Sequence, residues 1–144
     1  MQQPKSLDTA FIKNNEHVNK NLRAAKERSE RRKRKKVLVI DSDEKFLREI
    51  KKAFEALGIK AIVSTNPLSF FKQIGKNNIQ AVVVGIVRTG ETCLDILAHL
   101  QGEPYPKIAI GSESEWSELP EYAKFCSKNQ PVPKLAENIM SLAS

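Results

Sequence analysis

The chain has 144 residues, which is enough for one globular domain with an appendage and too few for two domains of ordinary size. Its net charge of +7 is uneven: residues 1–36 hold twelve Lys and Arg against four Asp and Glu, and residues 37–144 hold twelve against thirteen. No stretch approaches the roughly 18 apolar residues of a transmembrane helix, and no apolar signal-peptide core is present, so we expect a cytoplasmic protein without membrane contact.

Residues 1–35 form a basic leader that we expect to be helical or partly disordered. Ala, Glu, Lys, Arg and Leu are frequent from residue 8 on, and the leader ends in a run of six adjacent positive charges with one more just before it: Arg28, Arg31, Arg32, Lys33, Arg34, Lys35 and Lys36. Such a run binds phosphates without reading base sequence, so nucleic acid is one candidate partner. A solvated spacer or a contact for an acidic protein is the alternative interpretation.

From residue 36 on, short apolar runs alternate with helical patterns. We expect strands at residues 37–40, 60–64, 79–87, 107–110 and 122–127, and helices at residues 44–57, 67–75, 91–100 and 133–142. Asp43 is placed to cap the first of these helices, and Gly58 to end it. Strands that alternate with helices predict a parallel sheet with right-handed crossovers, so residues 36–144 are expected to form one domain.

Two of the predicted strands resemble the first and third strands of a response-regulator receiver (CheY-like) domain: Lys36–Glu44 and Ala81–Gly90. The resemblance implies an α/β fold with a doubly wound, five-stranded parallel sheet in the order 2-1-3-4-5. In receivers two acidic metal ligands follow the first strand, and the third strand ends on the aspartate that accepts a phosphoryl group. The resemblance places Asp41 and Ser42 at the acidic positions and Gly85 at the acceptor position. Because glycine has no carboxylate, we expect no phosphotransfer, no enzyme activity and no cofactor.

The other receiver positions are also altered. The fourth strand ends in Ile110–Ser112, where the expected hydroxyl is missing or displaced, and Lys128 is in place but the proline that follows it has moved to Pro131. We interpret Asp41, Asp43 and Lys128 as a remnant acidic pocket, in which Asp43 caps a helix and Asp41 pairs with Lys128. This interpretation is preferred over a magnesium site, which needs one or two carboxylates plus phosphate oxygens.

The stretch from Ser112 to Pro120 is too short and polar for the fourth helix of a receiver, so a loop or a single turn is expected there. The glycine at the acceptor position, this shortened stretch and the displaced proline are similar to the receiver-like N-terminal domain of FleQ-family flagellar regulators. That domain acts without phosphorylation and precedes an ATPase domain and a helix-turn-helix domain, neither of which lies within the 144 residues. Four side chains form a candidate protein interface, unless they belong to the core: Trp116, Leu119, Tyr122 and Phe125.

The sequence therefore predicts a phosphorylation-independent receiver-like module that acts by dimerisation or by docking to a protein partner, in bacterial signalling, transcription or flagellar control. The alternative is a nucleic-acid-binding adaptor tethered through the basic leader. Cys93 and Cys126 are interpreted as small buried hydrophobic residues, and His17 and His99 as surface residues, because none has a partner at metal-ligand spacing.

Overall fold

The computed structural model describes residues 22–23, 35–87, 92–116 and 118–144. The chain divides into two units, residues 1–34 and residues 35–144. Of the helix expected in the leader, Leu22 and Arg23 are described, and both are helical. The rest of the leader, including its basic residues from Arg28 to Arg34, lies outside the described residues.

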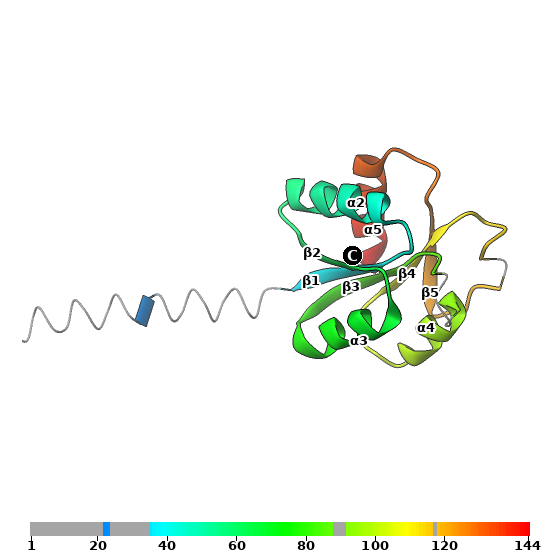
Figure 1. Ribbon diagram of the computed structural model, residues 1–144, viewed down its shortest axis with the longest axis horizontal. Helices are drawn as coiled ribbons and strands as arrows, with labels where there is room; N and C mark the ends of the chain where they lie inside the picture. Colours follow the sequence, from blue (N-terminus) through cyan, green and yellow to red (C-terminus); the bar gives the residue numbers. More distant parts are fainter. Residues whose placement is uncertain (1–21, 24–34, 88–91, 117) are drawn as a thin grey trace, which may run out of the picture. The chain divides into compact units, whose positions relative to one another are not determined.

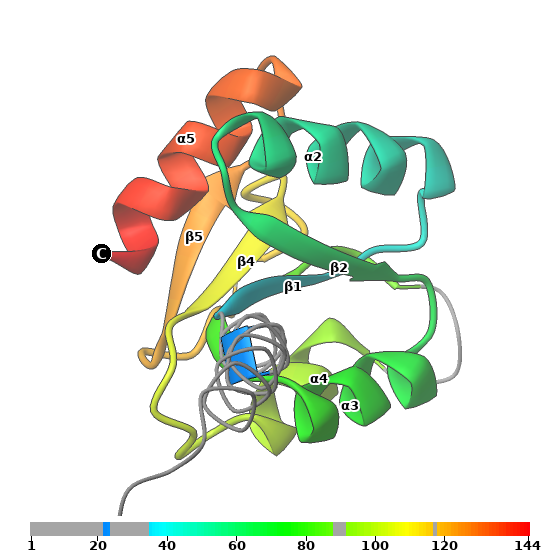
Figure 2. The same ribbon diagram turned by 90° about the vertical axis from the view of Figure 1, so that its left-hand side faces the viewer.

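The folded unit is a five-stranded sheet covered by helices on both faces. Its elements are β1 (Lys36–Ile40), α2 (Glu44–Ala56), β2 (Lys60–Ser64), α3 (Pro67–Lys76), β3 (Ile79–Val84), α4 (Cys93–His99), β4 (Lys107–Gly111), β5 (Ala123–Ser127) and α5 (Val132–Ala143). The strands pair in parallel in the order β2-β1-β3-β4-β5, which confirms the predicted doubly wound topology. Helices α2 and α5 cover one face of the sheet and α3 and α4 the other (Figures 1 and 2). None of the described helices is long and apolar enough to cross a membrane.

Local sequence signals set the helix boundaries. The Asp43 carboxylate accepts a hydrogen bond from the Phe46 amide at 3.1 Å and so caps α2, as the sequence predicts. Gly58 follows this helix with a φ of +77°, a conformation that favours glycine. Asn66 caps α3 through the Ser69 amide, and Pro67 occupies the first turn of that helix.

The third strand is shorter than predicted. We expect it to reach Val87, but the ladder ends at Val84, where pairing with β4 also stops. Gly85 and Ile86 still form hydrogen bonds with the end of β1 and with the residues just after it. The Gly85 amide donates to the Ile40 carbonyl at 2.7 Å, and the Ser42 amide donates to the Ile86 carbonyl at 3.0 Å. Residues 85–86 therefore line the carboxyl edge of the sheet as irregular backbone rather than as strand.

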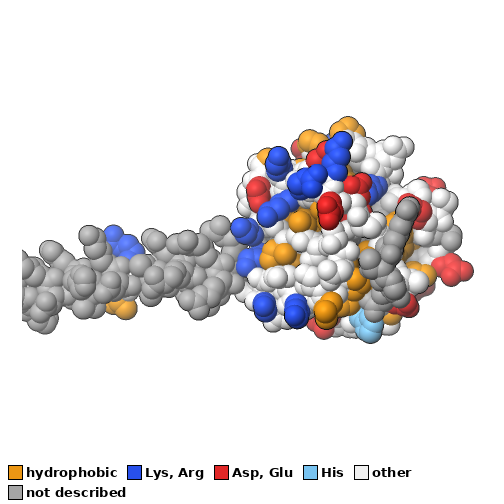
Figure 3. All heavy atoms as spheres, in the orientation of Figure 1, with side chains coloured by type: hydrophobic (Ala, Val, Ile, Leu, Met, Phe, Trp, Pro, Cys, Tyr) orange, Lys and Arg blue, Asp and Glu red, His pale blue; other side chains and the backbone are white. Residues whose placement is uncertain are grey.

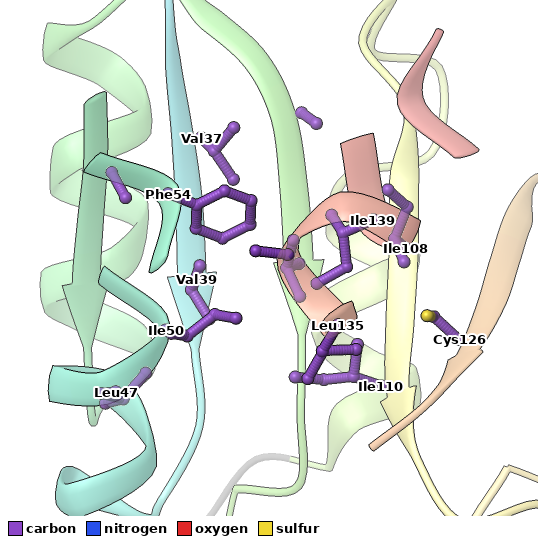
Figure 4. Packing of buried hydrophobic residues seen from close by; sticks show 14 of the residues in the cluster. Val37, Val39, Leu47, Ile50, Phe54, Ile108, Ile110, Cys126, Leu135 and Ile139 are labelled. Atoms are coloured by element: carbon purple, nitrogen blue, oxygen red, sulfur yellow. The ribbon is translucent and has the colours of Figure 1, made fainter. Parts of the chain in front are cut away.

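Each face of the sheet has its own apolar core. On the α2 and α5 side, aliphatic residues of β1 and β4 meet Phe54, Ile50, Leu135 and Ile139 (Figure 4). On the other side, Leu38 and Ile40 of β1 pack with residues of α3 and α4. Because each fully buried large apolar side chain contributes about 1.5 to 3 kcal/mol, these two clusters supply the main stabilisation of residues 35–144.

Charge is divided between the two halves of the folded unit. Residues 35–87 hold nine Lys and Arg against five Asp and Glu, whereas the described residues from 92 to 144 hold four against seven. The sheet order places the first half on the β2 side and the second half on the β5 side. Figure 3 shows charged side chains of both signs over α2 on one face of the molecule.

Candidate functional site

The candidate site lies at the carboxyl end of the sheet, where Asp41 follows β1 and Lys128 follows β5. Asp41 is only 1% exposed. Its Oδ1 accepts a hydrogen bond from the Asp43 amide at 2.9 Å, and its Oδ2 accepts one from Lys128 Nζ at 3.0 Å. The buried carboxylate is thus held by one backbone donor and one opposite charge, as a buried carboxylate requires.

Lys128 is fixed from several directions. Its ammonium group lies 4.0 Å from the centre of the Phe46 ring, in addition to its ion pair with Asp41. Its backbone amide donates to the Gly111 carbonyl at 3.0 Å, which ties the end of β5 to the end of β4. The ion pair predicted from the sequence is therefore present, and it joins residues that lie 87 positions apart in the chain.

Gly85 lies directly beneath the Asp41 carboxylate. A Cβ atom added to Gly85 would lie 2.0 Å from Asp41 Oδ2, 2.8 Å from Asp41 Cγ and 3.1 Å from Asp41 Cβ. These distances are far inside van der Waals contact, so the Asp41 side chain occupies the space that any side chain at position 85 would need. A side chain at position 85 would therefore displace the Asp41 carboxylate from its present position.

The residues of this site do not fit the magnesium ion that the resemblance to receivers implies. One oxygen of Asp41 is engaged by Lys128, and the Asp43 carboxylate caps α2. Magnesium in proteins is usually bound through one or two carboxylates in near-octahedral geometry, and Gly85 supplies no carboxylate. Within the described residues, no group of three His, Cys, Asp or Glu side chains is arranged to hold a metal ion.

Trp116 closes the end of β4. Its indole Nε1 donates to the Ile110 carbonyl at 2.8 Å, and the side chain is 6% exposed. Gly111 has a φ of +151°, and a Cβ atom there would lie 2.9 Å from Trp116 Nε1. The indole thus reaches back to a buried backbone carbonyl and packs in the core, which is the alternative that the sequence left open for Trp116.

The remaining interface candidates are half-buried. Leu119, Tyr122 and Phe125 pack against the core on the α3 and α4 side and keep part of their surface exposed. In the basic run, Lys35 is exposed, but Lys36 belongs to β1 and its Nζ donates to Asn77 Oδ1 at 2.6 Å. The Lys36 ammonium thus has one hydrogen-bond partner in its own domain, and its role as a phosphate contact stays a prediction.

The two cysteines differ in burial. Cys126 is buried as expected, whereas Cys93 is half-buried and its Sγ accepts a hydrogen bond from the Val87 amide at 3.4 Å. Burial raises the pKa of the Cys93 thiol, and the negative charge of Asp41 raises it further. A thiol with a raised pKa is protonated at neutral pH, so Cys93 is not held as a reactive thiolate.

Comparisons with known proteins bear on the fold. No protein-family model matches the chain, and no curated protein matches its sequence. Solved structures do match: the receiver domain of the Francisella response regulator 1452 is 24% identical with a TM-score of 0.64, covering 76% of this chain and 96% of that one. A CheY-like receiver domain from Methylobacillus flagellatus is 16% identical with a TM-score of 0.61, covering 76% and 98%. The chain has the CheY-like receiver fold.

A third solved structure has the same fold. The response regulator TrrA of Thermotoga maritima is 18% identical with a TM-score of 0.65, covering 75% of this chain and 98% of that one, and it was solved in complex with Mg²⁺ and BeF.

Proposed function

We propose that this chain is a phosphorylation-independent receiver-like module that regulates by protein contact. The observation that carries the proposal is the position of the Asp41 carboxylate, which lies 2.0 Å from where a Cβ atom of residue 85 would be. The site therefore lacks an acceptor carboxylate, and a side chain at position 85 would require the Asp41 carboxylate to move.

The ion pair gives the site a stable arrangement without phosphate. A buried carboxylate with no counter-charge is costly, and here Lys128 supplies the counter-charge for Asp41. The Gly111 carbonyl and the Phe46 ring hold the backbone and the ammonium of Lys128 in addition. A module built this way offers one fixed surface to a partner, and its regulation comes from whether the partner is present.

The proposed setting is bacterial signalling, with transcription or flagellar control as in FleQ-type regulators and with a cytoplasmic location. The similarity to that type is supported by Gly85, by the short segment between β4 and β5, and by the position of Pro131. We place the boundary between the basic leader and the receiver-like domain at residues 35 and 36. The contact surface we propose is formed by the exposed parts of Leu119, Tyr122 and Phe125.

The phosphorylation part of this proposal is tested by treating the full chain with acetyl phosphate and Mg²⁺, followed by intact mass spectrometry. We expect no hydroxylamine-labile phosphate, and we expect no amide chemical-shift changes around Asp41 on adding beryllofluoride. TrrA, which was solved with Mg²⁺ and BeF, is the positive control. A labile phosphate on Asp41 or Asp43 would contradict the proposal.

The contact part is tested with two matched leucine variants. Leu119→Glu places a charge on the proposed surface, and Leu68→Glu places one on α3, where the native leucine is 71% exposed. We expect Leu119→Glu to abolish self-association measured by light scattering, or partner capture, and Leu68→Glu to leave both unchanged. Equal behaviour of the two variants would show that the contact lies elsewhere.

A second candidate function is favoured by the charge of residues 1–36, a net of +8 from twelve basic and four acidic residues. We propose as the alternative that this leader tethers the domain to nucleic acid through phosphate contacts. Lys and Arg side chains without interleaved aromatic residues bind the backbone without reading sequence.

A further inference from the structure

A patch of lysines lies at the amino edge of the sheet, at the end opposite to the Asp41–Lys128 pair. Because the strands are parallel, the segments that lead into them meet at this edge (Figure 1). Residues 35–36, 57–60 and 76–79 lead into β1, β2 and β3, and together they hold four lysines and no Asp or Glu. We call these four residues the lysine edge: Lys35, Lys36, Lys60 and Lys76.

The other half of the same edge has the opposite charge. Residues 100–107 and 118–123, which lead into β4 and β5, hold three Glu and one Lys. That lysine, Lys107, is 6% exposed, and its ammonium donates a hydrogen bond to the Glu103 carbonyl. The exposed positive charge is therefore confined to the side of β2, β1 and β3, where it forms a patch of one sign.

The contacts of Lys36 bring these charges close together. Lys36 and Lys60 are register partners on adjacent parallel strands, so their side chains leave the same face of the sheet with backbones about 4.8 Å apart. The Lys36 ammonium donates to Asn77 Oδ1 at 2.6 Å, and Asn77 directly follows Lys76 at the end of α3. Neighbouring like charges repel, and neither ion pair of the described residues, 41–128 or 134–137, includes one of these lysines. The patch thus costs stability in the free protein, and an external anion would relieve that cost.

Helix α3 accounts for part of this patch. Lys76 lies in its last turn, where a positive charge stabilises the negative end of the helix dipole. Lys35 and Lys60 are also exposed but lie outside the helix. Lys35 directly follows the basic residues 31–34 in the chain. The lysine edge therefore continues the basic run of the sequence onto the folded unit.

We propose that the lysine edge binds the phosphate backbone of a nucleic-acid duplex. This inference rests on the nucleic-acid tether proposed above and extends it from the leader to the folded unit. Ammonium groups one strand separation apart, about 4.8 Å, suit a polymer with one charge per ~1.7 Å of its axis. The three segments hold no aromatic side chain to stack on bases, so binding does not depend on sequence. Their one exposed large hydrophobic residue, Leu57, is too little for insertion into a lipid surface.

The test measures the affinity of the full chain for a fluorescent duplex of arbitrary sequence, at salt concentrations from ~50 to ~200 mM. The double variant Lys60→Gln/Lys76→Gln removes two phosphate contacts. The slope of the logarithm of the binding constant against the logarithm of the salt concentration should become smaller by about 1.8, at about 0.9 per contact. The affinity at ~100 mM salt should fall at least about tenfold. In the wild-type chain, the amide signals of residues 58–61 and 76–79 should shift when the duplex is added.

Lys45→Gln/Lys52→Gln is the matched control. It removes the same charge from two exposed lysines of α2, which covers the face of the sheet opposite to α3 (Figure 2). Its salt slope should equal that of the wild type, and its affinity should stay within about threefold, because charges that make no contact act only through screened attraction. Urea unfolding of both double variants checks that the fold is intact.

The outcomes separate the lysine edge from the leader. If the wild-type chain fails to bind the duplex at ~50 mM salt, the tether and this inference are both wrong. If it binds and the two double variants lose affinity equally, the leader binds alone and the lysine edge is not a contact. Anionic vesicles and poly-glutamate are titrated in parallel. A loss in Lys60→Gln/Lys76→Gln that is confined to one of these would assign the edge to a lipid surface or an acidic protein and would overturn the proposal.

Discussion

Gly85→Ala is the substitution whose cost can be worked out most directly from the structure. The new methyl group would lie 2.0 Å from Asp41 Oδ2, so the carboxylate must leave its position. Moving it breaks the hydrogen bond from the Asp43 amide and the 3.0 Å contact with Lys128 Nζ. The perturbation is therefore one methyl group, and its effect is the loss of a buried ion pair.

The magnitude follows from the burial of the two partners. Breaking a fully buried pair costs about 3 to 5 kcal/mol, because one charge is left without compensation. Here the Asp41 side chain is 2% exposed but that of Lys128 is 29% exposed, so water compensates the lysine in part. We expect Gly85→Ala to lower the free energy of unfolding by about 2 to 3 kcal/mol, which corresponds to a fall in Tm of about 10 °C for a domain of this size.

The assay is urea unfolding followed by the fluorescence of Trp116, the one tryptophan of the sequence, which is buried in the fold. Asp41→Ala and the double variant complete a double-mutant cycle. Without the carboxylate, the closest contact of the new methyl group is the Cβ of residue 41 at 3.1 Å, so Gly85→Ala should cost much less in that background. Additive effects of the two substitutions, or a loss below about 0.5 kcal/mol in the single variant, would refute the reasoning.

The other predictions concern β4, the thiols and the leader. Gly111→Ala should destabilise the fold by about 1 to 3 kcal/mol and shift the Trp116 emission to the red, because φ is +151° and the methyl group would meet the indole; an unshifted spectrum would contradict this. Burial raises the pKa of the Cys93 and Cys126 thiols, so as pH rises these thiols lose their protons in the unfolded chain before they do so in the folded chain. The free energy of unfolding should therefore fall above about pH 9. Replacing both cysteines by Ala should make this fall smaller in unfolding curves measured from about pH 8 to 10. If the leader binds nucleic acid, its affinity for unrelated DNA and RNA sequences should be equal, and a plot of the logarithm of the binding constant against the logarithm of the salt concentration should have a slope of about −0.9 per phosphate contacted. Replacing residues 31–34 with Gln should abolish most of this affinity. An affinity that does not depend on salt would exclude this mode of binding.

The order of the elements could be predicted because its signals are local. Alternating apolar runs and amphipathic stretches gave the strands and helices, and Asp43 and Gly58 marked the ends of α2. The strand order was predicted from the resemblance to receivers, and the observed sheet confirms it. The end of β3 was not predicted, because Ile86 and Val87 continue an apolar run although pairing with β4 stops at Val84.

The site could be predicted only in part. The pairing of Asp41 with Lys128 followed from placing both at the carboxyl edge of the sheet, but the reason for Gly85 depends on a distance between two segments that sequence does not contain. For Trp116 the sequence left an interface and the core as alternatives, and the hydrogen bond from its indole to the Ile110 carbonyl, which favours the core, depends on a turn that sequence does not specify.

The uneven charge of the folded unit has a consequence for how the molecule approaches large partners. With nine basic and five acidic residues in residues 35–87 and four and seven in the described residues beyond, the domain carries an electric dipole directed across the strands. The electric field of a polyanion would exert a torque on this dipole, which would turn the β2 side toward the polyanion and the β5 side away from it. The face bearing Leu119, Tyr122 and Phe125 belongs to the outward half, so attachment to a polymer and recognition of a protein would occur on opposite sides and need not compete.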